Sequence, residues 1–374
     1  MFRMMGALAG ASFLAPILAA CGGSESTPTT APTAGGQAST GSSGGATPAS
    51  TPRAATPPST PTGTIGGTLT VYSGRSENLV KPIIDRFAQE TGVKVEVRYG
   101  NTAEMAAAIL EEGDNSPADV FFAQDAGALG ALAREQRLAS LPADILDLVE
   151  PRFRSRDGVW VGVSGRARAV VYNTERVAES DIPPSILDFT DPKWKNRLGW
   201  APTNASFQAA VTALRLLRGD EVARQWLEGI RDNGAKVFES NDVIVRAVIN
   251  GEIDAGFVNH YYLHRELAEA GHDLPARNYI YRNGDPGALI NVAGAAILST
   301  ATQQEQAAAF VRFLLQPEAQ AYFAQETHEY PLIPGVPTDP NLVPLAEIQT
   351  PDLDLSDLAD LDATLEMLRD VGLL

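Results

Sequence analysis

Strand-like and helix-like patterns of hydrophobic residues alternate along the chain from residue 68 onward. Apolar and polar residues alternate over 69–72 and 93–99, as they do in strands, and apolar residues recur at helical spacing over 79–87. Two strands joined through a helix form a strand–helix–strand unit, so this pattern predicts an α/β fold. The loop 73–77 follows the first strand at its carboxyl end, where open α/β sheets bind ligands.

The alternation restarts after a long β-prone run over residues 161–172. Gly165 interrupts this run, and a long strand broken by glycine is typical of a crossover between domains. Beyond it, the pattern predicts a strand over 198–200 and a short buried strand over 251–258, and we expect residues 285–298 to return to the first domain. The chain is therefore predicted to form two α/β domains.

Length and charge limit the classes of function. The chain has 374 residues, 44% of them hydrophobic, and its formal net charge is −17 at pH 7. This length suffices for two domains of ordinary size. Because the negative charge repels phosphate groups, we expect no nucleic-acid-binding surface.

The N-terminal residues have the form of a secretory signal followed by a cysteine. Arg3 precedes an apolar run over 8–20, and Cys21 is the only cysteine, so no intramolecular disulfide can form. We expect residues 1–20 to be a lipoprotein signal peptide and Cys21 to be lipidated, which anchors a soluble domain without a membrane span. A plain signal peptide followed by an incidental cysteine is the alternative.

A segment of low complexity separates this cysteine from the first predicted strand. Residues 22–65 are almost wholly Gly, Ser, Thr, Pro and Ala, with Glu25 and Arg53 as their only charges. Such a composition buries too little apolar surface to offset the entropy of ordering. We therefore predict that residues 21–66 comprise the lipidated cysteine and a disordered tether.

The densest group of chemically active side chains follows the buried strand 251–258. Two phenols and two imidazoles occur between Asn259 and His264. Adjacent tyrosines are commonly core aromatics whose hydroxyl groups reach water. His260 and His264 have the spacing of two zinc ligands on one helix face, but Tyr261 stands where a metalloprotease helix has glutamate. This sequence therefore disfavours a zinc hydrolase.

Other patterns of catalysis are missing from the sequence. There is no Gly-rich phosphate fingerprint, no recognised Ser/His/Asp motif and no second cysteine for a thiolate site, so we expect no enzyme. The polar turn 202–206 precedes an amphipathic helix. Its backbone donors suit either an anion or an ordinary helix cap.

From about residue 69 to residue 336 the chain resembles the ferric-ion-binding proteins of bacterial iron ABC importers. The matching stretches are 70–74, 116–121, 164–166, 170–174, 192–197, 250–255, 259–262 and 285–289. The resemblance implies a two-lobed solute-binding clamp of type II, in which each lobe is a mixed sheet flanked by helices and hinge strands join the lobes. We expect lobe 1 to comprise 67–165 plus 291–340, and lobe 2 to comprise 166–290 plus 341–374.

The resemblance implies that Tyr261 and Tyr262 supply two phenolate ligands to the metal. Ferric ion is a hard Lewis acid that selects anionic oxygen. A free phenol has a pKa of about 10, but a neighbouring trivalent cation stabilises the phenolate. Two phenolates do not balance three positive charges, so a carbonate or phosphate ion is expected beside the metal. The implied anion-binding residues are Arg166, Asn204, Ala205, Ser206, Asn241 and Asn259.

The chain also departs from the pattern of that family. Ser76 and Gln124 stand where many members have a histidine and a glutamate, and Phe207 stands where others have a further tyrosine. Gln124 and Glu77 are therefore weaker candidates for metal ligands, and Asp125 could supply a carboxylate in place of Glu77. Glu77 could equally be an exposed carboxylate in the first turn of a helix.

The expected function is capture of ferric ion outside the cytoplasm and its delivery to an ABC permease. We expect a monomer held at the cell membrane only by lipidated Cys21, in the periplasm or at the cell surface. One alternative is the same clamp with a small organic solute, such as a polyamine, thiamine or a phosphonate. A zinc-dependent hydrolase on His260 and His264 is the remote alternative.

Overall fold

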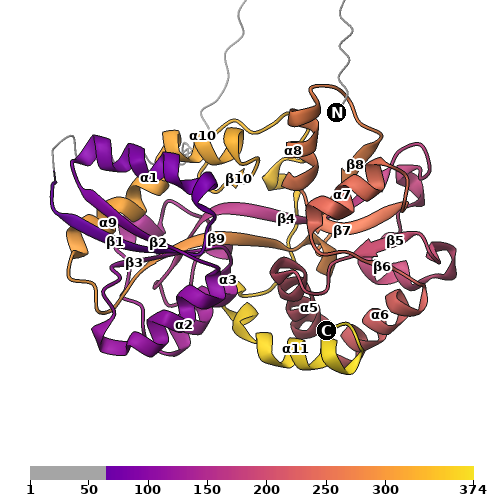
Figure 1. The fold of residues 1–374 in the computed structure, drawn as a ribbon, viewed down its shortest axis with the longest axis horizontal. Helices are drawn as coiled ribbons and strands as arrows, with labels where there is room; N and C mark the ends of the chain where they lie inside the picture. Colours follow the sequence, from indigo (N-terminus) through magenta and orange to yellow (C-terminus); the bar gives the residue numbers. More distant parts are fainter. Residues whose placement is uncertain (1–64) are drawn as a thin grey trace, which may run out of the picture. The chain divides into compact units, whose positions relative to one another are not determined.

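The computed structural model of the protein describes residues 65–374 (Figure 1). The predicted signal peptide, Cys21 and residues 22–64 lie outside the described residues. Ile65 and Gly66, at the end of the predicted tether, both donate backbone hydrogen bonds to the carbonyl of Thr91. In the part of the chain that the structure describes, no helix combines the length and apolar character that a membrane span requires.

A mixed sheet with the strand order β2-β1-β3-β9-β4-β7-β5-β6 organises the fold, and β8 and β10 also pair with β4. The strands are β1 (Thr68–Ser73), β2 (Lys94–Tyr99), β3 (Val120–Ala123), β4 (Val161–Asn173), β5 (Leu198–Trp200), β6 (Lys236–Val237), β7 (Ala255–Asn259), β8 (Ala276–Tyr279), β9 (Ile290–Ile297) and β10 (Tyr330–Pro331). β1 runs parallel to β2 and β3, as the strand–helix–strand pattern predicted.

Strand β4 is the predicted crossover. Its residues 161–167 pair antiparallel with β9, and its residues 168–173 pair with β7 and β8. All of β4 and β9 is buried, which explains the mostly apolar sequence of β9, whereas β4 also buries Ser164, Arg166 and Arg168. Figure 1 shows the two strands side by side. We call the part containing β1, β2 and β3 the first lobe, and the part containing β5, β6, β7 and β8 the second lobe.

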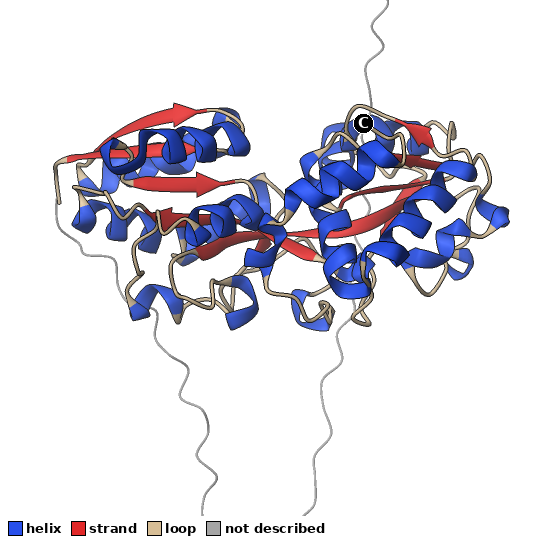
Figure 2. Cartoon of the chain, turned by 90° about the horizontal axis from the view of Figure 1, so that it is seen from below, coloured by secondary structure: helices blue, strands red, loops and turns tan. Residues whose placement is uncertain are grey.

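Helices pack against the sheet of each lobe (Figure 2). Those of the first lobe are α1 (Glu77–Thr91), α2 (Thr102–Glu112), α3 (Ala126–Arg134), α4 (Ala143–Leu146), α9 (Gln304–Leu314) and α10 (Pro317–Glu326). Helix α1 buries the apolar face that its periodicity predicted, and Phe87 on that face packs 5.1 Å from the ring of Phe310 on α9. Gly92 ends α1 with a φ of 72°, a backbone conformation that glycine adopts readily.

The second lobe has its own helices and aromatic core. The helices are α5 (Ala205–Arg218), α6 (Asp220–Asp232), α7 (Asn241–Ile249) and α8 (Tyr261–Ala270). Phe207 lies at the centre of the core, with its ring 5.8 Å from that of Trp200 and 6.3 Å from that of Trp226. Phe207 is therefore a packing residue here and supplies no ligand atom.

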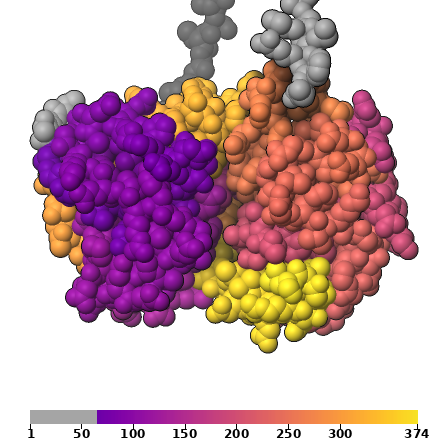
Figure 3. All heavy atoms as spheres, viewed as in Figure 1, coloured from indigo at the N-terminus to yellow at the C-terminus, as the bar shows by residue number. Residues whose placement is uncertain are grey.

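The C-terminal segment contacts both lobes. Its elements are η8 (Leu355–Ala359), which packs against α3, and α11 (Leu361–Asp370), which packs against α5. Figure 3 shows these residues, in yellow, beside atoms of both lobes. The other single-turn helices are η1 (Gly113–Asn115), η2 (Pro151–Phe153), η3 (Glu179–Asp181), η4 (Ile186–Thr190), η5 (Pro192–Trp194), η6 (Pro286–Ala288) and η7 (Leu345–Glu347).

The fold confirms the predicted class, an α/β protein of the two-lobed type II kind. The division of the chain between the lobes stays a prediction, because η8 and α11 contact different lobes within one short segment.

Candidate metal and anion site

The adjacent tyrosines begin helix α8 immediately after strand β7. Tyr261 is buried, Tyr262 is half-buried, and their rings stack with centroids 4.4 Å apart. Burial raises the pKa of the Tyr262 phenol, and the neighbouring Tyr261 raises it further. The Tyr262 phenol is therefore neutral near pH 7 unless a cation stabilises its ionised form.

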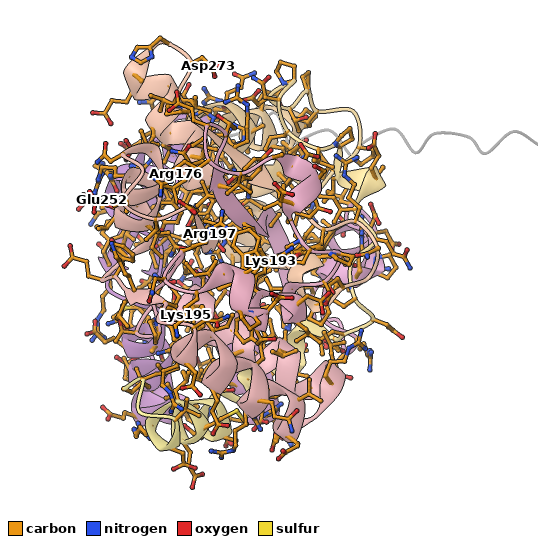
Figure 4. The ribbon with its side chains drawn as sticks, turned by 90° about the vertical axis from the view of Figure 1, so that its right-hand side faces the viewer. Arg176, Lys193, Lys195, Arg197, Glu252 and Asp273 are labelled. Carbon is orange, nitrogen blue, oxygen red and sulfur yellow. The ribbon has the colours of Figure 1, made fainter. Side chains whose placement is uncertain are left out.

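The start of β7 is fixed by a buried carboxylate. Asp254, directly before the strand, accepts hydrogen bonds from the side chains of Arg176 and Arg197. Figure 4 labels both arginines. The backbone of Asp254 also bonds to Arg197 and Asn173, at 2.8 and 2.9 Å. These bonds hold the strand that leads into the tyrosines.

Two arginines on β4 lie close to the phenols. Arg166 and Arg168 are two residues apart, so both side chains leave the same face of the strand. They are 2% and 6% exposed, and neither forms a salt bridge with a carboxylate in the described part of the chain. Burial lowers the pKa of Arg168 to about 10, while negative charge on Tyr261 and Tyr262 would act in the opposite direction.

Arg168 connects the predicted anion-binding residues. Its Nη1 donates to Asn259 Oδ1 at 2.9 Å and to Ser206 Oγ at 3.4 Å. Asn241 in turn accepts from the backbone N–H of Asn259 at 3.2 Å. The structure thus brings Ser206, Asn241 and Asn259 together around an arginine that the sequence analysis missed. Its spacing from Arg166 on one strand was the signal that could have found it.

Two buried donors in this group lack a partner. Arg166 donates from Nη2 to the carbonyl of Gln124, but its Nε has no hydrogen-bond partner among the described residues. The same holds for Nδ2 of Asn241, which is 1% exposed. Buried donors are nearly always paired in native proteins, so these two atoms suit a bound acceptor.

The start of α5 is mainly a helix cap. Oδ1 of Asn204 accepts from the backbone N–H of Ser206 at 3.0 Å and from its hydroxyl at 2.5 Å. Asn204 is therefore already engaged, whereas Ser206 also contacts Arg168. Ala205, the first residue of α5, is exposed and lines a cavity of about 610 Å³.

The first-lobe candidates lie in different places. Gln124, Ser76 and Asp125 line the same cavity as Ala205. Gln124 meets Arg166 through its backbone carbonyl, and Asp125 caps α3 by accepting from the N–H of Ala128 at 3.2 Å. Glu77 is exposed in the first turn of α1 and lines a separate groove with Lys81 and Asp85. A role of Gln124 or Glu77 as metal ligand stays a prediction.

The two histidines do not form a zinc site. His260 is fully buried, and its Nδ1 and Nε2 contact the backbone of Ala167 and His328. Burial lowers the pKa of His260 to about 3, so the ring is neutral. Nδ1 of His264 lies 3.1 Å from Asp339. Within residues 65–374, no three His, Cys, Asp or Glu side chains are grouped as metal ligands.

Known proteins similar to this chain match most of its length. The family described as bacterial extracellular solute-binding protein matches residues 82–350. A major ferric iron-binding protein of Neisseria meningitidis is 36% identical over 310 residues, which cover 82% of this chain and 93% of that protein. An Fe(3+)-binding periplasmic protein of Serratia marcescens is 32% identical over 308 residues, which cover 82% of this chain and 90% of that protein.

Solved structures agree with these relatives. Iron-bound HitA of Pseudomonas aeruginosa superposes with a TM-score of 0.76 at 37% identity, over 82% of this chain and 99% of that one. A Trichodesmium protein in complex with iron and citrate superposes with a TM-score of 0.73 at 28% identity, over 82% of this chain and 100% of that one. The chain belongs to the bacterial extracellular solute-binding protein family, and the relatives named here are iron-binding proteins, as the sequence resemblance implied.

Proposed function

We propose that this protein binds ferric ion through the phenolates of Tyr261 and Tyr262, with an oxyanion held by Arg166 and Arg168. The observation that carries this proposal is a pair of buried guanidinium groups beside two stacked phenols, with neither guanidinium in a salt bridge with a carboxylate of the described residues. A buried charge without a partner is costly, so the arrangement favours anionic groups at this place.

The charges explain why metal and anion belong together. Without metal, neither arginine forms a salt bridge with a carboxylate of the described residues, and Arg166 is offset only in part by Glu329, which is already paired with Arg75. With ferric ion bound, two phenolates offset the arginines, but the metal's own charge stays uncompensated. An anion of more than one negative charge then stabilises the site. Carbonate and phosphate fit this requirement, and the Trichodesmium relative with iron and citrate adds an organic carboxylate to the candidates.

The relatives support a role in transport. Members of this family bind solutes outside the cytoplasm, and the named relatives are an iron-binding periplasmic protein and ferric iron-binding proteins. We therefore propose delivery of iron to an ABC permease, by a monomer anchored through lipidated Cys21. A Cys21→Ala variant should appear in the soluble fraction, whereas the unchanged protein should stay with the membrane fraction.

The test of iron binding is a ferric titration of the purified protein, with and without bicarbonate or phosphate. We expect a visible phenolate-to-iron absorption band in the unchanged protein and its loss or large reduction in Tyr261→Phe and Tyr262→Phe. Tyr322→Phe is the control, because the hydroxyl of Tyr322 donates to Leu79 in the first lobe. A protein that shows no band and retains no iron by elemental analysis would refute the proposal. Binding of a polyamine, thiamine or a phosphonate instead would support the organic-solute alternative.

A further inference from the structure

His260 occupies the junction between the strand that precedes the tyrosines and the helix that carries them. Strand β7 ends at Asn259, which pairs with Arg168 on β4, and α8 begins at Tyr261. The next pair in this antiparallel register is His260 with Ala167. Ala167 lies between the two arginines of the proposed anion site, so this pair connects the phenols to the guanidinium groups.

The imidazole of His260 replaces a backbone acceptor. In a regular antiparallel ladder, every second pair of opposite residues exchanges N–H···O bonds in both directions, and His260 and Ala167 occupy such a position. His260 donates its own N–H to the carbonyl of Ala167 at 3.0 Å. Its backbone is already helical, with φ −57° and ψ −40°, and its carbonyl instead accepts from Asn278 at 2.7 Å. Nδ1 of the ring accepts the N–H of Ala167 at 3.1 Å in place of that carbonyl.

The other ring nitrogen connects the same residue to the segment before β10. Nδ1 accepts the N–H of Ala167, so it carries no proton, and the proton of the neutral ring is on Nε2. Nε2 lies 2.8 Å from the carbonyl oxygen of His328, to which it donates. The next residue, Glu329, is held by two bonds from Arg75, at 3.0 and 3.1 Å. His260 thus ties the start of α8 to β4 on one side and to a buried ion pair on the other.

The ring also packs against Tyr261 itself. The His260 and Tyr261 rings meet edge to face with centroids 5.7 Å apart, and the Tyr330 ring lies 4.8 Å away on β10. A ligand that is placed to within about half an ångström needs neighbours that lock its side chain. The bonds and packing of His260 meet that requirement.

We propose that His260 is a positioning residue that sets the phenols of Tyr261 and Tyr262 against Arg166 and Arg168, and so couples metal binding to anion binding. This inference rests on the proposed function. Replacing the imidazole with an apolar side chain leaves the Ala167 N–H unpaired and frees the start of α8. The phenols and the arginines then lose their fixed separation.

The experiment compares His260→Leu, His260→Gln and His264→Leu. Glutamine can accept and donate through its amide, so it can replace part of the imidazole's bonding. His264 is the matched control, because it is a buried histidine on the same helix with one side-chain bond, to Asp339. The measurements are the position of the phenolate-to-iron band, and the rate of iron loss to a competing chelator at several phosphate concentrations.

We expect His260→Leu to shift the absorption band and to release iron about 10- to 100-fold faster, because residues that orient metal ligands contribute that much to metal binding. The release rate of this variant should also depend less on the phosphate concentration. His260→Gln should lie between this variant and the unchanged protein, and His264→Leu should match the unchanged protein. A Leu variant with the unchanged band and release rate overturns the inference alone, as does equal behaviour of His260→Leu and His264→Leu. If the unchanged protein gives no band, the proposed function fails and this inference fails with it.

Discussion

Arg168 donates a hydrogen bond to the side-chain oxygen of Asn259 over 2.9 Å, although 91 positions separate the two residues in the chain. The bond joins the strand that crosses between the lobes to the strand that leads into the tyrosines. The guanidinium is buried, and it lies near enough to Tyr261 and Tyr262 for negative charge on them to raise its pKa. It supplies positive charge at a place where no carboxylate in the described chain neutralises it.

Replacing Arg168 with methionine should weaken iron binding by roughly tenfold or more, because bonds to a charged group contribute about 1.5–3 kcal/mol. The loss should be larger with phosphate or carbonate present, since the arginine acts through the anion. Competition with a chelator measures the effect. Arg265→Met on the exposed side of α8 is the control and should leave the affinity unchanged. An equal loss with and without anion would show that Arg168 acts on the tyrosines alone.

Ferric binding should release about two protons from the phenols, because metal ligands must be deprotonated. Burial raises the pKa of Tyr262 in the metal-free protein, so its phenol carries its proton at neutral pH. Affinity should therefore rise with pH and fall in acid. Titration of the protein with a ferric complex at constant pH measures the protons released. Tyr262→Phe should release about one proton fewer than the unchanged protein, and equal release would exclude Tyr262 as a ligand.

The parts of the fold that follow from local pattern could be predicted from the sequence. The hydrophobic periodicity over 68–99 predicted the first strand–helix–strand unit, and the long β-prone run ending at Tyr172 predicted the crossover strand. Both signals depend only on residues that are neighbours in the sequence. The tyrosine pair was proposed as the candidate metal site from its position after a buried strand and from the family resemblance, and its role stays a prediction.

The remainder of the site depends on contacts between distant segments. Arg168 meets Asn259 and Ser206, and His260 meets Ala167 and His328, across separations that no periodicity reports. The unpaired donors on Arg166 and Asn241 became visible only once the surrounding side chains were placed. Likewise, the sequence could not show that Gln124 presents its backbone carbonyl to Arg166.

The buried pair of Arg75 and Glu329 should be a large contributor to stability. Their side chains are 0% and 2% exposed, so removing one charge leaves the other buried and unpaired. Glu329→Gln should lower the free energy of unfolding by about 3–5 kcal/mol, measured by urea denaturation at pH 7. Glu150→Gln, in an exposed pair with Arg152, is the control and should change it by less than about 1 kcal/mol.

The effect of Glu329 should depend on pH in a defined direction. Burial alone would raise its pKa, but the charges of Arg75 and Arg166 and its hydrogen bonds outweigh burial and lower the pKa below 4.5. A carboxylate with a lowered pKa stabilises the fold above its unfolded-state pKa and loses that contribution as pH falls through the folded-state value. The difference between the unchanged protein and Glu329→Gln should therefore be constant above about pH 4.5 and shrink below it. A difference that grows in acid would contradict this assignment.

Gly130 on α3 allows the C-terminal segment to lie against the first lobe. A Cβ at this position would stand 2.1 Å from the carbonyl oxygen of Ser356 in η8, a backbone atom that cannot turn away. Gly130→Ala should therefore lower the free energy of unfolding by about 1–3 kcal/mol, despite the better helix propensity of alanine, and should loosen residues 355–359. Thermal unfolding and amide hydrogen exchange over this segment measure the two effects. Gly100→Ala is the control, because its new Cβ would meet only the ends of the flexible Met105 and Glu104 side chains, which can move away. If Gly130→Ala proved as stable as Gly100→Ala, with unchanged exchange over 355–359, the close contact between α3 and η8 would not hold in solution.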